Sequence, residues 1–184
     1  MNLANKLTLL RVLMIPVFLV ALLSPLFDGQ TARYVAAGIF ILAALTDSLD
    51  GYVARKYNMI TNLGKFMDPL ADKLLVCAAL VALVELGDLP SWVVILIISR
   101  ELMITGFRVV AANNHVVLAA NFWGKLKTVT QMIMIIFVLV NLPLPFYNYL
   151  CVLLYWLAAI LTVVSAIDYL YHNFNVLKEN EDES

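Results

Sequence analysis

Long apolar segments limit what this 184-residue chain can fold into. A helix needs about 20 mostly apolar residues to cross the roughly 30 Å hydrocarbon core of a bilayer, and six segments reach or approach that length. The chain is 63% hydrophobic and only 14% charged, whereas a soluble domain has about 25% charged residues. Because so few polar side chains cannot cover a water-facing surface, we predict that lipid covers it. The six predicted membrane spans are residues 7–27, 34–53, 66–86, 89–110, 128–142 and 147–171.

The distribution of basic residues predicts the orientation of these spans. If both termini lie in the cytoplasm, only Arg33 among the 12 Lys and Arg residues falls on the outer side. Such an excess of Lys and Arg is typical of the cytoplasmic ends of membrane helices, and an even number of spans leaves both termini on one side. The predicted fold is therefore all-α. It is a single domain over residues 1–184, an integral membrane bundle of six transmembrane helices with both termini cytoplasmic.

Residues outside the charged clusters are predicted to have structural roles. Cys77 and Cys151 lie in apolar stretches without CxxC or Cys/His spacing, so we expect buried thiols and neither a disulfide nor a zinc site. The net charge of −1 gives no basic surface, and no nucleic-acid partner is expected. Trp and Tyr are enriched at membrane interfaces. Four aromatic residues near span ends are predicted to form such a belt: Trp92, Tyr147, Tyr149 and Tyr171.

Charged residues interrupt the second, third and fourth spans. Each of these spans is apolar near its outer end and polar near its inner end. Charged side chains within membrane segments are costly and usually face a bundle interior or a water-filled cavity. We therefore predict a polar cavity that opens to the cytoplasm. The residues concerned are Asp47 and Asp50 in the second span, Asp68, Asp72 and Lys73 in the third, and Arg100, Glu101 and Arg108 in the fourth.

Four of these carboxylates have spacings that suit a metal site. Asp47 and Asp50 are three residues apart, and Asp68 and Asp72 are four apart, so each pair lies on one face of a helix. Two adjacent helices would thus offer two carboxylates each. Oxygen-rich hard ligands of this kind suit Mg²⁺ or Mn²⁺, which keep waters and substrate phosphates in their remaining positions.

Two alternatives would use the same carboxylates. Interfacial Asp residues can simply cap helices or anchor them in headgroups, and a cation transporter with an acidic half-channel also places carboxylates in the membrane. Gly51 would allow close approach of a bulky ligand and Arg55 could hold a diphosphate bidentately, which favours phosphate chemistry. A transport path would need polar groups across the membrane depth, and the outer halves of these spans have almost none. We also find no internal repeat of the kind that alternating-access transporters usually contain.

The same stretch resembles the signature of the CDP-alcohol phosphotransferase family, D-x2-D-G-x2-A-R-x8-G-x3-D-x3-D. The resemblance implies a site with two metal ions at the cytoplasmic side of six helices, in a chain that forms a homodimer. Asp47, Asp50 and Asp68 would bind metal, and Asp72 would serve both at the metals and as the general base. Gly51, Ala54 and Arg55 would hold the CDP moiety. All eight fixed positions match: Asp47, Asp50, Gly51, Ala54, Arg55, Gly64, Asp68 and Asp72.

Further motifs predict the acceptor alcohol. Arg100, Arg108 and Lys125 are cations beyond those that a diphosphate needs, and they could bind the phosphate of an acceptor such as glycerol 3-phosphate. As alternatives, these cations and Lys127 could anchor helices in headgroups, and Glu101 could pair with Arg100 or Arg108. The motifs are Asn5-x2-Thr8-x2-Arg11, Ser99-Arg100-Glu101 with Arg108, and Gly124-Lys125-x-Lys127-Thr128.

These motifs resemble bacterial phosphatidylglycerophosphate synthases. The resemblance implies an enzyme of the cell membrane with its active site at the cytoplasmic face. Its substrates would be CDP-diacylglycerol, which enters from the membrane lipid, and glycerol 3-phosphate. Within the same family, the alternative acceptors are inositol phosphate, serine and phosphatidylglycerol.

Overall fold

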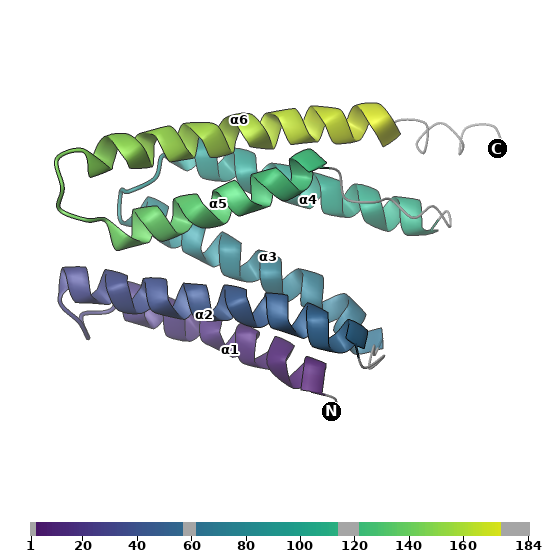
Figure 1. The fold of residues 1–184 in the computed structure, drawn as a ribbon, viewed down its shortest axis with the longest axis horizontal. Coiled ribbons are helices and arrows are strands. Elements are labelled where there is room, and N and C mark those ends of the chain that lie inside the picture. The colour runs from purple at the N-terminus through teal and green to yellow at the C-terminus, as the bar shows by residue number, and fades with distance from the viewer. Residues whose placement is uncertain (1–2, 57–61, 114–121, 174–184) are drawn as a thin grey trace. The chain divides into compact units, whose positions relative to one another are not determined.

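The computed structural model describes the backbone of residues 3–56, 62–113 and 122–173 (Figure 1). Within these ranges, side chains are described except at residues 3–8, 47–56, 62–70, 72, 110, 112 and 113. The described residues form six α-helices and no strand, which confirms the all-α prediction. The helices are α1 (Leu3–Leu23), α2 (Gly29–Lys56), α3 (Asn62–Glu85), α4 (Ser91–Asn113), α5 (Phe122–Val140) and α6 (Tyr147–Asn173).

Each predicted span coincides with one helix, but most helix ends differ by several residues from the apolar pattern. Helix α5, for example, begins at Phe122, six residues before the predicted start of its span. Hydropathy detects only the apolar part of a helix, whereas backbone hydrogen bonding continues through polar residues. Helix α1 instead ends early, at Leu23, because Pro25 follows and disfavours helical geometry in the residue before it.

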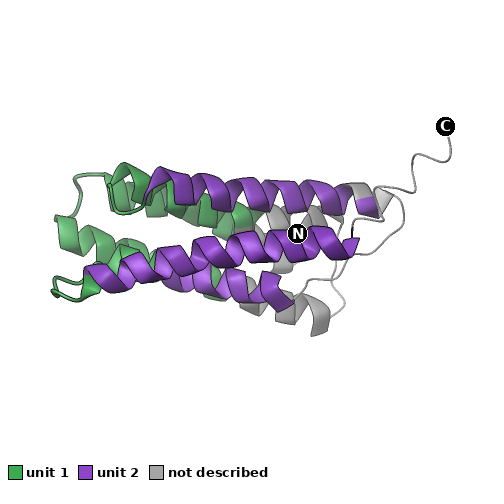
Figure 2. Ribbon diagram, turned by 90° about the horizontal axis from the view of Figure 1, so that it is seen from above, with its two compact units in different colours: residues 1–89, 135–147 green, residues 90–134, 148–184 purple. Residues whose placement is uncertain are grey.

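The chain divides into two compact units (Figure 2). Unit 1 comprises residues 1–89 and 135–147, and unit 2 comprises residues 90–134 and 148–184. In unit 1, α1 packs against both α2 and α3. Small side chains such as Ala36, Ala43 and Ala79 are fully buried there, which allows helix backbones to approach closely. The rings of Phe18 in α1 and Phe40 in α2 add an aromatic contact, with centroids 6.3 Å apart.

Arg33, the one basic residue that the orientation prediction places on the outer side, forms an ion pair. The Nη1 atom of Arg33 lies 2.7 Å from Oδ2 of Asp88, and both side chains are largely buried. The same guanidinium nitrogen also donates to the carbonyl of Val138 at 3.5 Å, and Gln30 donates to the carbonyl of Val140 at 2.8 Å. The last carbonyls of a helix have no partner within it. Arg33 and Gln30 in α2 therefore satisfy the C-terminal carbonyls of α5.

The structure corrects the prediction for one aromatic residue of the interfacial belt. Tyr147 is only 7% exposed. Its hydroxyl donates to the carbonyl of Phe137 at 2.8 Å, and the two rings are stacked with centroids 6.0 Å apart. Tyr147 is therefore a core residue of unit 1, since its polar tip is satisfied inside the protein. Trp92, Tyr149 and Tyr171 are exposed, and their place in a belt stays a prediction.

The exposed surface is that of a membrane protein. Large apolar side chains are exposed along all six helices, among them Leu13, Ile95 and Leu153, whereas soluble monomers rarely expose large apolar patches. Among the described residues, two helices, α5 and α6, are long and apolar enough to cross a membrane by length and composition. Helix α1 has a shorter apolar stretch, Leu9–Leu23. Charged residues such as Arg33 in α2 and Arg100 in α4 interrupt the other helices.

Candidate active site

The signature residues lie at one end of unit 1. Helix α2 continues through Asp47, Asp50 and Arg55 to its last residue Lys56, and α3 begins at Asn62 before Asp68 and Asp72. This confirms the helical backbone on which the spacing argument depends. The end of α2 and the start of α3 are separated by five residues, and Figure 1 shows them at the same end of the unit. Four aspartates therefore belong to two neighbouring helix ends.

The donor set of this helix end suits a divalent metal. The side chains of the seven predicted site residues in α2 and α3 lie outside those described, but their residue types and their positions along the two helices are known. Carboxylates at i,i+3 on one helix and i,i+4 on the next provide hard oxygen donors, which Mg²⁺ and Mn²⁺ prefer. Among the described side chains, no group of three or more His, Cys, Asp and Glu residues could hold a metal. The seven residues are Asp47, Asp50, Gly51, Ala54, Arg55, Asp68 and Asp72.

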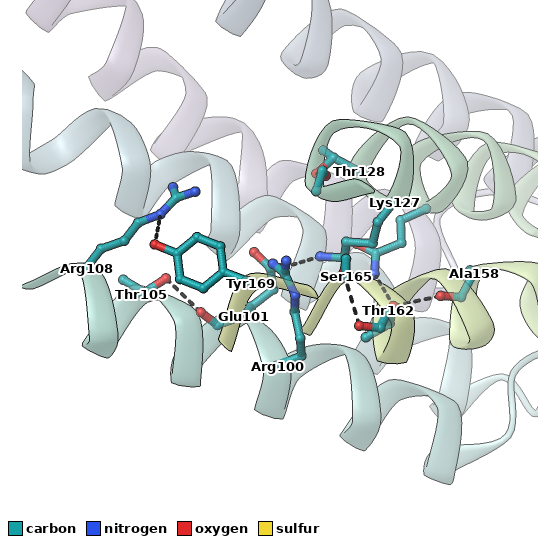
Figure 3. A network of polar contacts seen from close by, with 12 residues as sticks. Arg100, Glu101, Thr105, Arg108, Lys127, Thr128, Ala158, Thr162, Ser165 and Tyr169 are labelled. Carbon is teal, nitrogen blue, oxygen red and sulfur yellow. Dashed lines mark hydrogen bonds and ion pairs between the residues drawn. The ribbon is translucent and has the colours of Figure 1, made fainter. Parts of the chain in front are cut away.

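A second polar cluster lies in unit 2, between α4 and α5 (Figure 3). Glu101 is at its centre. The Oε1 atom of Glu101 accepts from Nη1 of Arg100 at 3.1 Å, and it also contacts the ammonium of Lys127. We call Arg100, Glu101 and Lys127 the α4–α5 cluster. Of the two sequence alternatives for Glu101, pairing with Arg100 is confirmed, whereas Arg108 has a different partner.

The two lysines of the GKxKT motif have different surroundings. Lys127 is 1% exposed and faces Glu101, whereas Lys125 is exposed. A headgroup anchor must reach the membrane surface, so the anchor alternative is wrong for Lys127. Its ammonium instead compensates a carboxylate inside the protein. Lys125 alone of this pair is available to a ligand from solution.

Arg100 lies against the start of α5. Its Nη2 atom is 3.8 Å from the position that a Cβ atom on Gly124 would occupy. Its Nε atom is buried and has no hydrogen-bond acceptor among the described residues. Because Nη1 is bonded to Glu101, one edge of the guanidinium is fixed while other N–H groups keep their capacity to donate. The Arg100 guanidinium therefore lies next to Gly124, the residue before Lys125. Arg100 and Lys125, two of the three predicted acceptor-binding cations, thus belong to neighbouring segments.

Arg108 lies further along α4. It is eight positions after Arg100, which corresponds to roughly 12 Å along a helix axis. Its Nε atom donates to the hydroxyl of Tyr169 in α6 at 3.3 Å, and its side chain is exposed. In Figure 3, Arg108 lies at one end of the drawn network, and Arg100 lies between it and Lys127.

The sequence patterns missed three features of unit 2. Tyr169 belongs to no motif, and no sequence signal identifies it as the partner of Arg108. The Glu101–Lys127 pair joins residues 26 positions apart, and only the packing of α4 on α5 reveals it. The third feature is a buried hydrogen bond of 3.1 Å between Gln131 and Thr162, which links α5 to α6. The sequence does contain one signal for such contacts, the polar residues inside apolar spans, since these usually form hydrogen bonds between helices.

Comparisons with known proteins agree with the signature. A family model described as CDP-alcohol phosphatidyltransferase matches residues 1–164. The CDP-diacylglycerol–glycerol-3-phosphate 3-phosphatidyltransferase of Bacillus subtilis (strain 168) is 45% identical over 188 aligned residues, covering 96% of this chain and 97% of that protein. The probable phosphatidylglycerophosphate synthase of Mycobacterium tuberculosis (strain H37Rv) is 46% identical over 170 residues, covering 91% and 79%. A Haemophilus influenzae enzyme with the same name as the Bacillus protein is 38% identical, covering 92% and 91%. The chain therefore belongs to the CDP-alcohol phosphatidyltransferase family.

Proposed function

We propose that this protein transfers a phosphatidyl group from CDP-diacylglycerol to sn-glycerol 3-phosphate, giving phosphatidylglycerophosphate and CMP. The observation that supports this most is the 45% identity, over nearly the whole of both chains, to a relative with that name. The family signature is complete, and its spacing fits the helices α2 and α3. The exposed cations Arg108 and Lys125 and the partly buried Arg100 suit an acceptor that carries its own phosphate.

The chemistry follows from the residues at the end of unit 1. Asp47, Asp50, Asp68 and Asp72 would hold two divalent ions, Mg²⁺ or Mn²⁺. Ions bound there would neutralise the diphosphate and stabilise CMP as the leaving group. Asp72 would accept the proton of the attacking hydroxyl, since a carboxylate beside cations remains ionised and can act as a general base.

Substrate binding is divided between two sets of side chains in this proposal. Gly51 and Ala54 would let the CDP moiety approach the backbone of α2 closely, and Arg55 would hold its diphosphate bidentately. Arg100, Arg108 and Lys125 would bind the phosphate of glycerol 3-phosphate, because each is a cation with several N–H donors.

The acceptor is tested by a panel of alcohols. Purified protein with CDP-diacylglycerol and Mg²⁺ should release CMP with radiolabelled glycerol 3-phosphate, and the label should appear in lipid. Serine, inositol phosphate and phosphatidylglycerol should each give at least about 100-fold lower kcat/KM, because the acceptor site gains a charge-assisted contact only from a fitting phosphate. Faster turnover with any of these three would reassign the acceptor and leave the family membership intact.

We further propose that the whole chain, residues 1–184, acts as one multi-pass domain of the cell membrane. Six spans would place both termini and the signature end in the cytoplasm, and the protein would act as a homodimer. The family match continues across both compact units, and nearly all Lys and Arg residues then lie on the cytoplasmic side. Glycerol 3-phosphate would enter from the cytoplasm, while the lipid tails of CDP-diacylglycerol would enter from the bilayer.

Cysteine labelling tests this orientation. On a background in which Cys77 and Cys151 are replaced by alanine, a membrane-impermeant maleimide should leave Asn58→Cys unmodified in intact cells and modify it after lysis. The matched outer position is Phe146, which lies between α5 and α6 and is 77% exposed. Phe146→Cys should react in intact cells. The reverse pattern would show that the orientation is wrong.

A further inference from the structure

Tyr169 holds Arg108 through a contact that no motif predicts. The Nε atom of Arg108 donates to the tyrosine hydroxyl at 3.3 Å, and the guanidinium carbon lies 5.5 Å from the centroid of the same ring. The tyrosine is only 2% exposed. Its ring is packed edge-on against Phe107 of α4, with centroids 5.9 Å apart and an interplanar angle of 82°. The buried Tyr169 side chain on α6 therefore holds the Nε end of the exposed Arg108 guanidinium on α4.

The atoms used in this contact matter for ligand binding. A guanidinium has five N–H donors, and binding through Nε leaves the four on its two terminal nitrogens. Figure 3 shows these terminal nitrogens directed away from the tyrosine ring. Bidentate recognition of a phosphate requires a pair of N–H groups in a fixed orientation. Arg108 thus keeps the pair that a phosphate would use.

Arg100 and Arg108 have partners of different chemical type. Arg100 is held by the carboxylate of Glu101, which offsets part of its positive charge. Tyr169 holds Arg108 through a hydroxyl group, and this contact offsets none of the positive charge that would attract an anion. A flexible arginine on an exposed helix face loses rotamer freedom when it binds a ligand. A side chain that is already held loses less, and this raises its affinity.

We propose that Tyr169 is a positioning residue for the acceptor: it orients Arg108 so that the terminal nitrogens of Arg108 bind the phosphate of glycerol 3-phosphate. This inference rests on the proposed function, because it assigns Arg108 to the acceptor site. It adds α6 to the elements that determine acceptor affinity. Tyr169 itself touches no substrate in this arrangement and acts through Arg108 alone.

Tyr169→Phe is the direct test, because it keeps the ring and its packing on Phe107 and removes only the hydroxyl. Loss of one hydrogen bond to a positioned arginine should raise the KM for glycerol 3-phosphate about 3- to 10-fold. The KM for CDP-diacylglycerol and the kcat should stay within about 2-fold of the parent values. Tyr171→Phe is the matched control: Tyr171 is on the same helix and 82% exposed, and its substitution should change none of these constants.

A double-mutant cycle separates positioning from a structural role. In an Arg108→Gln background, Tyr169→Phe should cause no further rise in the acceptor KM, because the residue through which it acts is gone. Arg108→Lys keeps the charge but lacks an Nε–H group, so it should show a raised acceptor KM that is equally insensitive to Tyr169→Phe. Melting temperatures of all variants in detergent should be measured alongside.

The outcomes distinguish this inference from the proposed function. An acceptor KM that Tyr169→Phe leaves unchanged, while Arg108→Gln raises it, would overturn the role of Tyr169 alone. An equal rise in the parent and Arg108→Gln backgrounds would also overturn it, since Tyr169 would then act by another route. A normal acceptor KM in Arg108→Gln would remove Arg108 from the acceptor site, and the inference about Tyr169 would fall with it.

Discussion

Removal of divalent metal with excess EDTA should abolish turnover of CDP-diacylglycerol, and added Mg²⁺ or Mn²⁺ should restore it. The diphosphate of CDP-diacylglycerol is negatively charged, and CMP must leave from it. The side chains of the signature neutralise this charge only in part. Of the eight fixed positions of the signature, one is a cation, Arg55, and four are carboxylates, while Lys56 and Lys65 lie between them at variable positions. Carboxylates would repel a diphosphate unless bound cations reversed the local charge.

Asp68→Asn provides the site-specific form of this experiment. Losing an outer-shell partner of a metal typically weakens affinity about 10- to 100-fold. Loss of a direct ligand should raise the Mg²⁺ concentration for half-maximal activity by at least that much. Asp168→Asn is the matched control, because Asp168 lies in α6 and pairs with the exposed His172. Binding of Mn²⁺, followed by its electron paramagnetic resonance signal, should weaken in Asp68→Asn and stay unchanged in Asp168→Asn. Full turnover in excess EDTA would disprove the metal site.

The sequence predicted the number and order of the helices because local patterns determine both. Apolar length and turn residues such as Pro25 act within a few positions of where they occur. The same reasoning placed the signature aspartates correctly on α2 and α3, since a fixed spacing on a helix needs no tertiary information. Helix ends were less accurate, because polar residues extend a helix without an apolar signal.

Pairings between helices could not be predicted from such patterns. Tyr147 resembles an interfacial aromatic by position, and only the packing of its ring on Phe137 shows that it is buried. Lys127 and Lys125 are two residues apart in one motif, yet a helix turns about 200° over two residues and points them to different surroundings. Which of the two lysines is buried depends on where α4 packs against α5. The contact from Tyr169 to Arg108 requires α6 as well.

Arg100→Gln, Arg108→Gln and Lys125→Gln should each raise the KM for glycerol 3-phosphate about 10- to 100-fold. Each substitution removes a charge-assisted hydrogen bond to the acceptor phosphate, and such bonds contribute roughly 1.5–3 kcal/mol. The KM for CDP-diacylglycerol should change little, because Gly51, Ala54 and Arg55 are intact. Arg55→Ala should show the opposite pattern and weaken the CDP-linked substrate first. Steady-state kinetics with each substrate varied in turn would measure both effects.

Lys127→Gln is the matched contrast to Lys125→Gln, since the two lysines are neighbours in one motif but differ in burial. Removing the ammonium that Glu101 contacts breaks a partly buried ion pair. Because Glu101 keeps Arg100 as a partner, the loss of folding stability should be about 1–3 kcal/mol. Lys127→Gln should therefore lower the melting temperature and the folded yield, whereas Lys125→Gln should affect the acceptor KM and leave the melting temperature near the parent value. If Arg100→Gln and Lys125→Gln both kept a normal KM for glycerol 3-phosphate, the acceptor site would be assigned wrongly. The family membership would stand, because it depends on the signature in α2 and α3 and on the relatives and not on these cations.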